Sequence, residues 1–136
     1  MAGTWQPVSG LIEDDETAWA AALRELREET GLEARRLLTA EPLATFYVPW
    51  LDRVIISVAF GAELSDGQVM LSDEHDELAW CPPGEAADRM EWPTQRAAIT
   101  ELMGVLADPA RMSLREVPLQ GPRSPYGSPP RAEGRA

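Results

Sequence analysis

The sequence predicts a single α/β or α+β domain built around a mixed sheet. Its 136 residues are the length of one ordinary domain, and a hydrophobic share of 44% is enough to form a core. The predicted elements run in the order strand, helix, several strands and then helices, which is typical of a layered domain containing both kinds of element. No internal repeat interrupts this order.

The first elements are a short extended segment at residues 5–9 and a polar loop at residues 10–15. Residues 16–30 then give the strongest helix prediction, because they are rich in Ala, Leu, Glu and Arg and are followed by Gly31 as a C-cap. One face of this helix is predicted to be buried, and it consists of Trp19, Leu23, Leu26 and Thr30.

The middle of the chain is predicted to supply the sheet, and the region after it two helices. The expected strands are Arg36–Ala40, Ala44–Val48, Asp52–Ala62 and Leu78–Cys81, with a turn at Ser65–Gly67. Within the third of these strands, Val54–Phe60 is apolar on both faces, so it needs cover on both sides, and we expect part of that cover to be absent. After Pro82 and Pro83, residues 84–90 and 94–107 are predicted to be helical.

The domain is expected to span residues 1–107, followed by a Pro-, Gly- and Arg-rich flexible tail at residues 108–136. The stretch Pro118–Ala136 has few apolar residues with which to offset its ordering entropy. The longest apolar run, Val54–Phe60, is far too short to span a membrane, and no secretory signal is visible. A cytoplasmic location is therefore the expectation.

Charge and composition exclude several functional classes. The formal charge is −11, and all 12 basic residues are arginines. Such a chain repels nucleic acid and anionic membrane, so neither is expected as a partner. Without lysine it has neither a Walker-type phosphate loop nor a Schiff-base lysine. Cys81 is the only cysteine, which excludes a disulfide framework and a cysteine-based zinc site. His75 is the only histidine, which excludes a histidine-rich metal site within one chain.

Three glutamates gather on the predicted helix. Glu25, Glu28 and Glu29 are spaced i, i+3 and i+4, which places them within about 100° of one helix face. Like charges at this spacing repel, so the cluster needs a counter-charge. Two interpretations remain open from the spacing alone: a solvated acidic face paired with Arg24 and Arg27, or a site for a hard cation such as Mg²⁺ or Mn²⁺.

A longer pattern surrounds this cluster. It consists of Gly10, five residues, Glu16, seven residues, Arg24-Glu25, Leu26, Arg27, Glu28-Glu29, Thr30, Gly31 and Leu32. This segment resembles the Nudix box at every fixed position. The resemblance implies a Nudix-type α/β/α sandwich that binds Mg²⁺ or Mn²⁺ and hydrolyses a nucleoside diphosphate linked to another group.

The resemblance also assigns roles within the box. Glu25, Glu28 and Glu29 would be metal ligands, with one of them orienting or deprotonating the attacking water. Arg24 would hold a glutamate in place through a charge-assisted hydrogen bond. Gly10 would let the backbone approach the metal and offer its carbonyl. Glu16 would have a supporting structural role.

A second candidate element is the acidic loop before Trp80. Taken alone, such a loop is usually a solvated turn, but Glu74 resembles a glutamate that reaches the metals or acts as the base in many Nudix enzymes. His75 would contact phosphate or form only a local hydrogen bond, and the second role is preferred. Trp80 and Trp92 are expected in the core more readily than against a nucleobase.

The segment before the box suggests a subgroup and a substrate. Trp5 and Gln6, followed by a Val-Ser-Gly, resemble the lead-in of the dihydroneopterin triphosphate and dATP pyrophosphohydrolases, and so are candidates to bind a small nucleotide. Arg96, Ala98 and Ile99, on the last predicted helix, resemble the same subgroup. A diadenosine tetraphosphate hydrolase or a general nucleotide-sanitising enzyme remains an alternative.

The chain departs from the family at its N-terminus. Nudix domains usually place one or two strands ahead of the box, and only Trp5–Ser9 stands there in this sequence. Two explanations are considered: the start of the chain was assigned too late in a longer gene, or the chain is short. In both cases we expect the sheet to have open edges that need cover. This cover could come from a second copy of the chain in a homodimer, from upstream residues, or from Met112–Leu119 folding back as a strand. We rank the first two above the third. A non-catalytic nucleotide-binding or scaffold module on the same fold is the rival to an enzyme.

Overall fold

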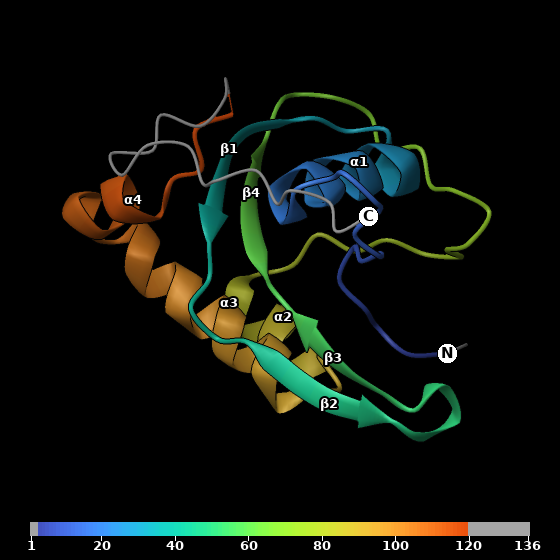
Figure 1. Cartoon of the computed structure of the whole chain (residues 1–136). Coiled ribbons are helices and arrows are strands. Elements are labelled where there is room, and N and C mark those ends of the chain that lie inside the picture. Colours follow the sequence, from blue (N-terminus) through green and yellow to red (C-terminus); the bar gives the residue numbers. More distant parts are fainter. Residues whose placement is uncertain (1–2, 120–136) are drawn as a thin grey trace.

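The computed structural model describes residues 3–119 of the chain (Figure 1). The elements follow one another as α1 (Ala18–Thr30), β1 (Ala34–Thr39), β2 (Ala44–Val48), the short 3-10 turn η1 (Pro49–Leu51), β3 (Arg53–Ser57), β4 (Phe60–Leu64), α2 (Pro83–Arg89), α3 (Pro93–Leu106) and α4 (Pro109–Arg115). The predicted first strand is wrong, because residues 5–9 form no strand and the first element is α1. From α1 onward, strands are followed by helices as predicted, and the predicted helix boundaries hold to within two residues for α1, α2 and α3.

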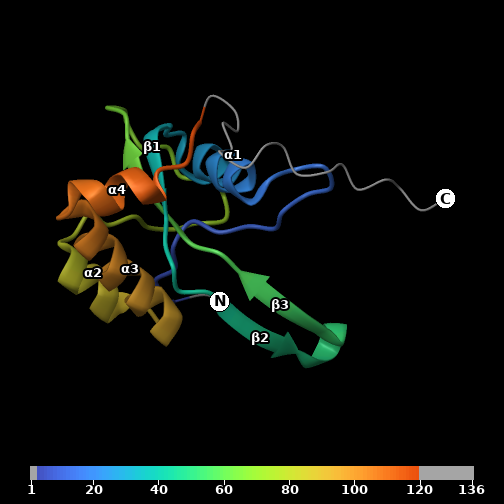
Figure 2. The ribbon, with the colours of Figure 1, turned by 60° about the vertical axis from the view of Figure 1, so that its left-hand side comes forward.

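The centre of the fold is the antiparallel pair β1–β4, in register from Ala34 opposite Leu64 to Thr39 opposite Phe60. Leu37 and Leu38 are consecutive in β1, so their side chains point to opposite faces, yet they are only 2% and 4% exposed. Helices must therefore cover both faces. Figure 2 shows α1 on one side of this strand pair and α2, α3 and α4 on the other, which confirms the expected α/β/α layering.

Glycine sets how closely α3 approaches the strand pair. A β-carbon added at Gly61 in β4 would lie 3.1 Å from a methyl group of Leu102, so this α3 side chain packs directly on the strand backbone. The buried side chains on this side include Ala98 and Val105 of α3. The core is consequently shared between β1, β4 and the helices that flank them.

The folded domain extends beyond Ala107, although the flexible tail was expected to begin at residue 108. Asp108 caps α4 by accepting a hydrogen bond from the Ala110 N–H at 3.0 Å. Glu116 then forms an antiparallel bridge with Leu38, and the Val117 N–H donates to the Leu37 carbonyl at 2.8 Å. The fold-back of residues 112–119 thus occurs, mainly as a helix with a single bridge instead of a strand. The expected flexible region at residues 120–136 lies outside the described residues.

The predicted single strand at residues 52–62 is wrong. Two strands occupy this region, β3 and β4, and they belong to different sheets: β3 pairs with β2, whereas β4 pairs with β1. Among the described residues, part of the cover that this apolar strand needs is absent, as expected: Val54 and Ile56 in β3 are 64% and 65% exposed. An apolar strand run looks continuous in sequence, but the chain changes sheets at Val58–Ala59.

Two further sheet predictions fail. All strand pairings within residues 3–119 are antiparallel, in two separate two-stranded sheets, so the expected mixed sheet is not formed by these residues. Residues 78–81 are irregular and mostly exposed, and they are not a strand. They have no neighbouring strand among the described residues with which to form a ladder. None of the helices in this part of the chain combines the length and the apolar character of a membrane span.

Candidate active site

The helix that carries the glutamates is well bounded at both ends. Thr17 accepts a hydrogen bond from the Ala20 N–H at its N-terminus, at 3.2 Å. Gly31 ends it in the left-handed conformation, with φ of 71°, and donates to the Arg27 carbonyl. The predicted C-cap is confirmed. The helix begins at Ala18 and not at Glu16, because Thr17 is the cap and Glu16 belongs to the preceding turn.

Arg24 is the centre of the ionic site on α1. Its Nε and Nη2 atoms donate to the two carboxylate oxygens of Glu16 at 3.0 and 3.1 Å, as a bidentate pair. Its Nη1 donates to Glu25 at 2.6 Å and to Glu28 at 3.2 Å, and Nη2 also donates to the Leu11 carbonyl at 2.9 Å. One guanidinium therefore draws together three acidic residues and the loop before the helix.

This arrangement shifts the acid–base behaviour of two members. The hydrogen bonds from Arg24 and from the Glu13 backbone favour the carboxylate of Glu16 and lower its pKa. The carboxylates of Glu16 and Glu25 raise the pKa of Arg24 above its ordinary value. Both groups are thus held in their charged forms at neutral pH.

Gly10 allows the loop to lie directly against Glu25. A β-carbon built at Gly10 would come within 1.8 Å of Glu25 Oε1 and 2.0 Å of its carboxyl carbon. No side chain fits in that space unless Glu25 moves away. Glycine fits this position because the backbone and a carboxylate occupy adjoining space.

Glu29 is separated from the other two glutamates by its burial and by its partners. It is only 5% exposed. Its Oε2 lies 2.7 Å from Nε2 of His75, and its Oε1 accepts from the Ser9 N–H at 3.4 Å. Glu29 therefore links the end of α1 to the segment before the box and to the loop that carries the single histidine.

That loop is attached to the end of α1 by backbone hydrogen bonds. The Met70 N–H donates to the Thr30 carbonyl at 2.9 Å, and the Ser72 N–H donates to the Glu29 carbonyl at 3.1 Å. His75 is thereby held beside Glu29. Glu74, its neighbour, is exposed at the same loop. The two sequence-predicted elements, the box and the acidic loop, are adjacent in space.

The tryptophans do not all follow the prediction. Trp80 and Trp92 are 72% and 53% exposed, so the expectation that they belong to the core is wrong. Both sit at positions where the chain passes irregularly over the surface before α2 or α3. Trp5 is half-buried, and the guanidinium carbon of Arg89 lies 4.7 Å from the centre of its ring. This contact joins the segment before the box to α2.

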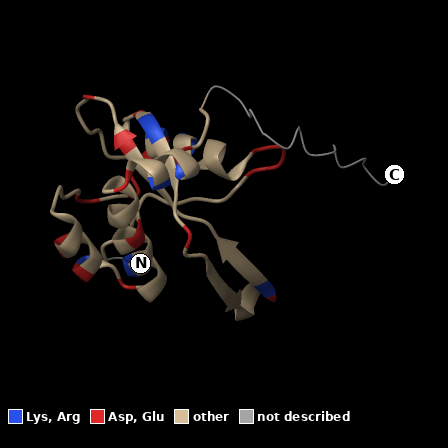
Figure 3. Ribbon diagram, turned by 90° about the vertical axis from the view of Figure 1, so that its left-hand side faces the viewer, with Lys and Arg blue, Asp and Glu red and all other residues tan. Residues whose placement is uncertain are grey.

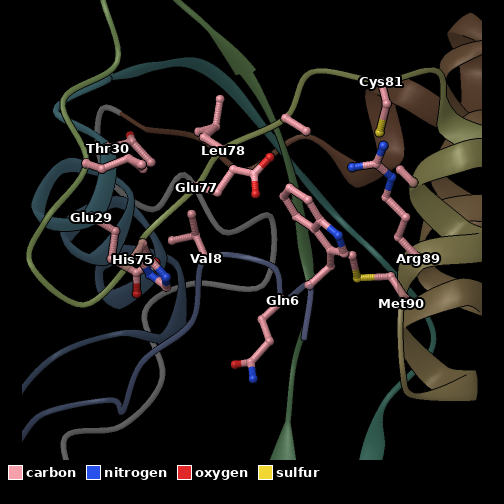
Figure 4. Close-up of a pocket in the computed structure, with 14 residues that line it drawn as sticks. Gln6, Val8, Glu29, Thr30, His75, Glu77, Leu78, Cys81, Arg89 and Met90 are labelled. Carbon is pink, nitrogen blue, oxygen red and sulfur yellow. The ribbon is translucent and has the colours of Figure 1, made fainter. Parts of the chain in front are cut away.

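A cavity of about 180 Å³ lies beside the Glu29–His75 pair (Figure 4). Figure 4 shows Glu29 and His75 on one side of it and Arg89 and Met90 on the opposite side. Trp5 and Gln6, both predicted to bind substrate, line its wall. Sequence reasoning missed Arg89, Glu77 and Cys81 as lining residues, because their approach to Trp5 and His75 depends on packing between distant segments. The complete wall consists of Trp5, Gln6, Val8, Glu29, Thr30, Leu71, His75, Glu77, Leu78, Ala79, Cys81, Ala86, Arg89 and Met90.

The donor set of α1 suits a hard divalent cation in its chemistry. Glu25 and Glu28 each give an oxygen to the same Arg24 nitrogen, so their carboxylates are close neighbours. Glu29 is turned instead toward His75. Within residues 3–119, no three side chains of the His, Cys, Asp or Glu types are gathered closely enough to form a metal centre. The ligand types fit Mg²⁺ or Mn²⁺, and the guanidinium of Arg24 supplies the positive charge between two of them.

Comparison with known proteins gives a consistent family match. The model of the NUDIX domain matches residues 1–102. CTP pyrophosphohydrolase of Escherichia coli K12 is 34% identical over 107 residues, which cover 79% of this chain and 74% of that protein. The asymmetrical bis(5'-nucleosyl)-tetraphosphatase of Rattus norvegicus is 27% identical over 100 residues, covering 71% of this chain and 68% of that protein.

A solved structure supports the same grouping. The crystal structure of a NUDIX hydrolase from Listeria monocytogenes has a TM-score of 0.62 with this chain, at 28% sequence identity. The match covers 76% of each chain. It therefore includes most of the α/β/α core and is not restricted to the glutamate helix.

Proposed function

The chain belongs to the Nudix hydrolase family, and we propose that it is a Mg²⁺- or Mn²⁺-dependent enzyme that hydrolyses a nucleoside triphosphate or a related nucleoside diphosphate compound. The products would be pyrophosphate, or another phosphorylated fragment, and a nucleotide. The observation that carries this proposal is the Arg24 cluster, in which one guanidinium orients Glu16, Glu25 and Glu28.

Glu25, Glu28 and Glu29, with the carbonyl of Gly10, are the residues that would hold the cation. Glu25 and Glu28 are neighbours around Arg24, and Gly10 lies directly against Glu25. When bound, a divalent cation neutralises phosphate oxygens and lowers the pKa of a bound water. The chain contributes the positions of the carboxylates, which Arg24 fixes before substrate arrives.

The cavity beside Glu29 and His75 is the proposed substrate pocket. Its apolar wall includes the ring of Trp5, and Gln6 and Arg89 offer hydrogen-bond donors to a ligand. A base held there would place its polyphosphate toward the end of α1. His75 already contacts Glu29, so its role in this proposal is to orient that carboxylate.

The substrate itself is proposed only as a class. The named relatives act on CTP and on dinucleoside tetraphosphates, which differ in the base and in the number of phosphates. These relatives support a small-molecule nucleotide as substrate without choosing among nucleotides. The resemblance of Trp5 and Gln6 to the dihydroneopterin triphosphate and dATP enzymes adds those two compounds to the candidates.

The rival proposal is a non-catalytic module that binds nucleotides on the same fold. A binding module has no need for the bidentate Arg24–Glu16 pair or for the close contact of Gly10 with Glu25. The presence of both features favours the enzyme. The two proposals differ in whether a bound nucleotide is turned over.

The deciding experiment measures pyrophosphate and phosphate release from a panel of nucleotides. The panel should include CTP, dATP, dihydroneopterin triphosphate and diadenosine tetraphosphate, each with Mg²⁺, with Mn²⁺ and with EDTA. We expect metal-dependent release from at least one member, with products identified by mass. Binding of a panel member without turnover would favour the non-catalytic module.

A further inference from the structure

One face of the hairpin formed by β2 and β3 is apolar and exposed along its whole length. In the antiparallel register, Thr45 lies opposite Ile56 and Tyr47 opposite Val54, so these four side chains share a face. Tyr47, Val54 and Ile56 are 55%, 64% and 65% exposed. Leu43 and Val58 extend the same face beyond the strands and are also exposed.

The hairpin stands apart from the rest of the described chain. Figures 1 and 2 show β2 and β3 extending away from the α/β/α core. Within residues 3–119, β2 and β3 hydrogen-bond only to each other as a ladder, so each has one open edge. An isolated two-stranded hairpin is marginally stable in water, and open edges of this kind pair readily with another strand. The fold-back of Glu116 and Val117 protects β1 and does not reach this hairpin.

The hairpin is also the part of the chain with the least charge. Between Leu43 and Ala59 the only charged residues are Asp52 and Arg53, which cancel. Figure 3 shows the tan hairpin with charge only at its tip, whereas acidic residues are spread over the core. Two copies of a chain with a formal charge of −11 repel one another over most of their surfaces. They can approach at this neutral face.

We propose that hairpin β2–β3 is a self-association surface, and that its occupant is a second copy of this chain. Antiparallel pairing of β3 with β3 around a two-fold axis at Ile55 satisfies the open edge of β3 in both copies, and β2 stays at the outer edge on each side. It places Val54 opposite the partner subunit's Ile56. Arg53 then faces the partner subunit's Ser57, so no like charges meet. The two apolar faces become one continuous four-stranded surface.

Pairing at β3 covers apolar side chains along the seam between the two copies. Val54 and Ile56 are 64% and 65% exposed in one chain. In the paired register each lies beside an apolar side chain of the partner subunit.

The test is sedimentation equilibrium of the full chain over a concentration series. We expect the mass to rise from 15.0 kDa toward twice that value as concentration increases. Ile56→Arg should weaken this association by about 10-fold or more, because it puts an unpaired charge into an apolar contact. The matched control is Leu114→Arg in α4, where the residue is 85% exposed and far along the chain from the hairpin. It should associate as the wild type does.

Hydrogen exchange of the wild-type protein gives a second readout that needs no variant. The β3 amides should become protected as the protein concentration rises. A chain that stays at 15.0 kDa throughout would overturn the proposal. So would equal association of Ile56→Arg and Leu114→Arg, or β3 protection that does not depend on concentration, which would mean that another segment of the same chain covers the hairpin.

Discussion

Gly10 and Glu25 are in contact so close that the structure leaves no room for a β-carbon between them: it would lie 1.8 Å from Glu25 Oε1. The same carboxylate oxygen accepts a hydrogen bond from Arg24 at 2.6 Å. The glycine of the loop and the arginine of the helix thus hold one glutamate from two sides. Any side chain at Gly10 must displace the Glu25 carboxylate from this position.

Gly10→Ala therefore should disrupt the site while the fold survives. We expect hydrolysis to fall by about 10-fold or more, because a positioned carboxylate is displaced. The control is Gly84→Ala in α2, where a new β-carbon would meet nothing within 4 Å. Steady-state kinetics and thermal melting of both variants measure the effect. Unchanged kcat in a folded Gly10→Ala protein would mean that the Gly10–Glu25 contact has no part in the reaction.

The Glu16–Arg24 pair predicts how stability depends on pH. Because hydrogen bonding lowers the pKa of Glu16 in the folded protein, its contribution to stability is present above the ordinary value of 4.5. It is lost as the pH falls through the lowered folded-state pKa. Glu16→Gln removes this contribution, so its melting temperature should fall less than that of the wild type upon acidification.

The control for Glu16→Gln is the same substitution at a neighbouring carboxylate that is exposed. Glu13→Gln serves this purpose, because Glu13 is an exposed acid in the same turn. Melting temperatures of the three proteins across the acid range give the result. Parallel curves for wild type and Glu16→Gln would show that the pair adds no pH-dependent stability.

His75 and Glu29 predict a stability effect of a different kind. Glu29 is 5% exposed and has the imidazole of His75 as its closest partner, at 2.7 Å. His75→Ala should cost about 1–3 kcal/mol in the free energy of unfolding, because a buried carboxylate loses a hydrogen bond. Urea denaturation measures this cost. A loss no greater than that of Asp73→Asn, an exposed change in the same loop, would contradict the role given to the pair.

Glu74 remains a predicted catalytic residue. It is exposed, next to His75, in the loop that is bonded to the end of α1. Glu74→Gln should lower kcat by about 10-fold or more without changing the melting temperature, since a general base contributes to rate and not to folding. Asp76→Asn, an exposed acid one residue beyond His75, is the kinetic control. Equal rates in the two variants would remove Glu74 from the site.

Local patterns predicted the elements and the placing of the helix side chains well where a single element determines them. Helix α1, its cap at Gly31 and strand β2 follow from periodicity and turn residues, and Arg24, Glu25 and Glu28 fall together because helix geometry fixes their spacing. Features that depend on contacts between distant segments were not predictable in this way.

The division of residues 52–62 is such a feature. Both strands are apolar, and only pairing with β1 or with β2 decides where one ends and the next begins. The contact of Arg89 with Trp5 similarly joins residues far apart in sequence, and no local spacing indicates it. The failure of Leu78–Cys81 as a strand has the same origin, since an extended segment becomes a strand only when it finds a partner.

The measurement that tests the central claim most directly is metal-dependent nucleotide hydrolysis by Glu28→Gln beside Glu33→Gln. Both glutamates are well exposed, with side-chain exposures of 59% and 66%, and both pair with an arginine. Only Glu28 belongs to the proposed ligand set. We predict that Glu28→Gln loses about 10²-fold or more in kcat while its fold is kept, and that Glu33→Gln stays near the wild type. A folded Glu28→Gln protein with wild-type turnover would contradict the account.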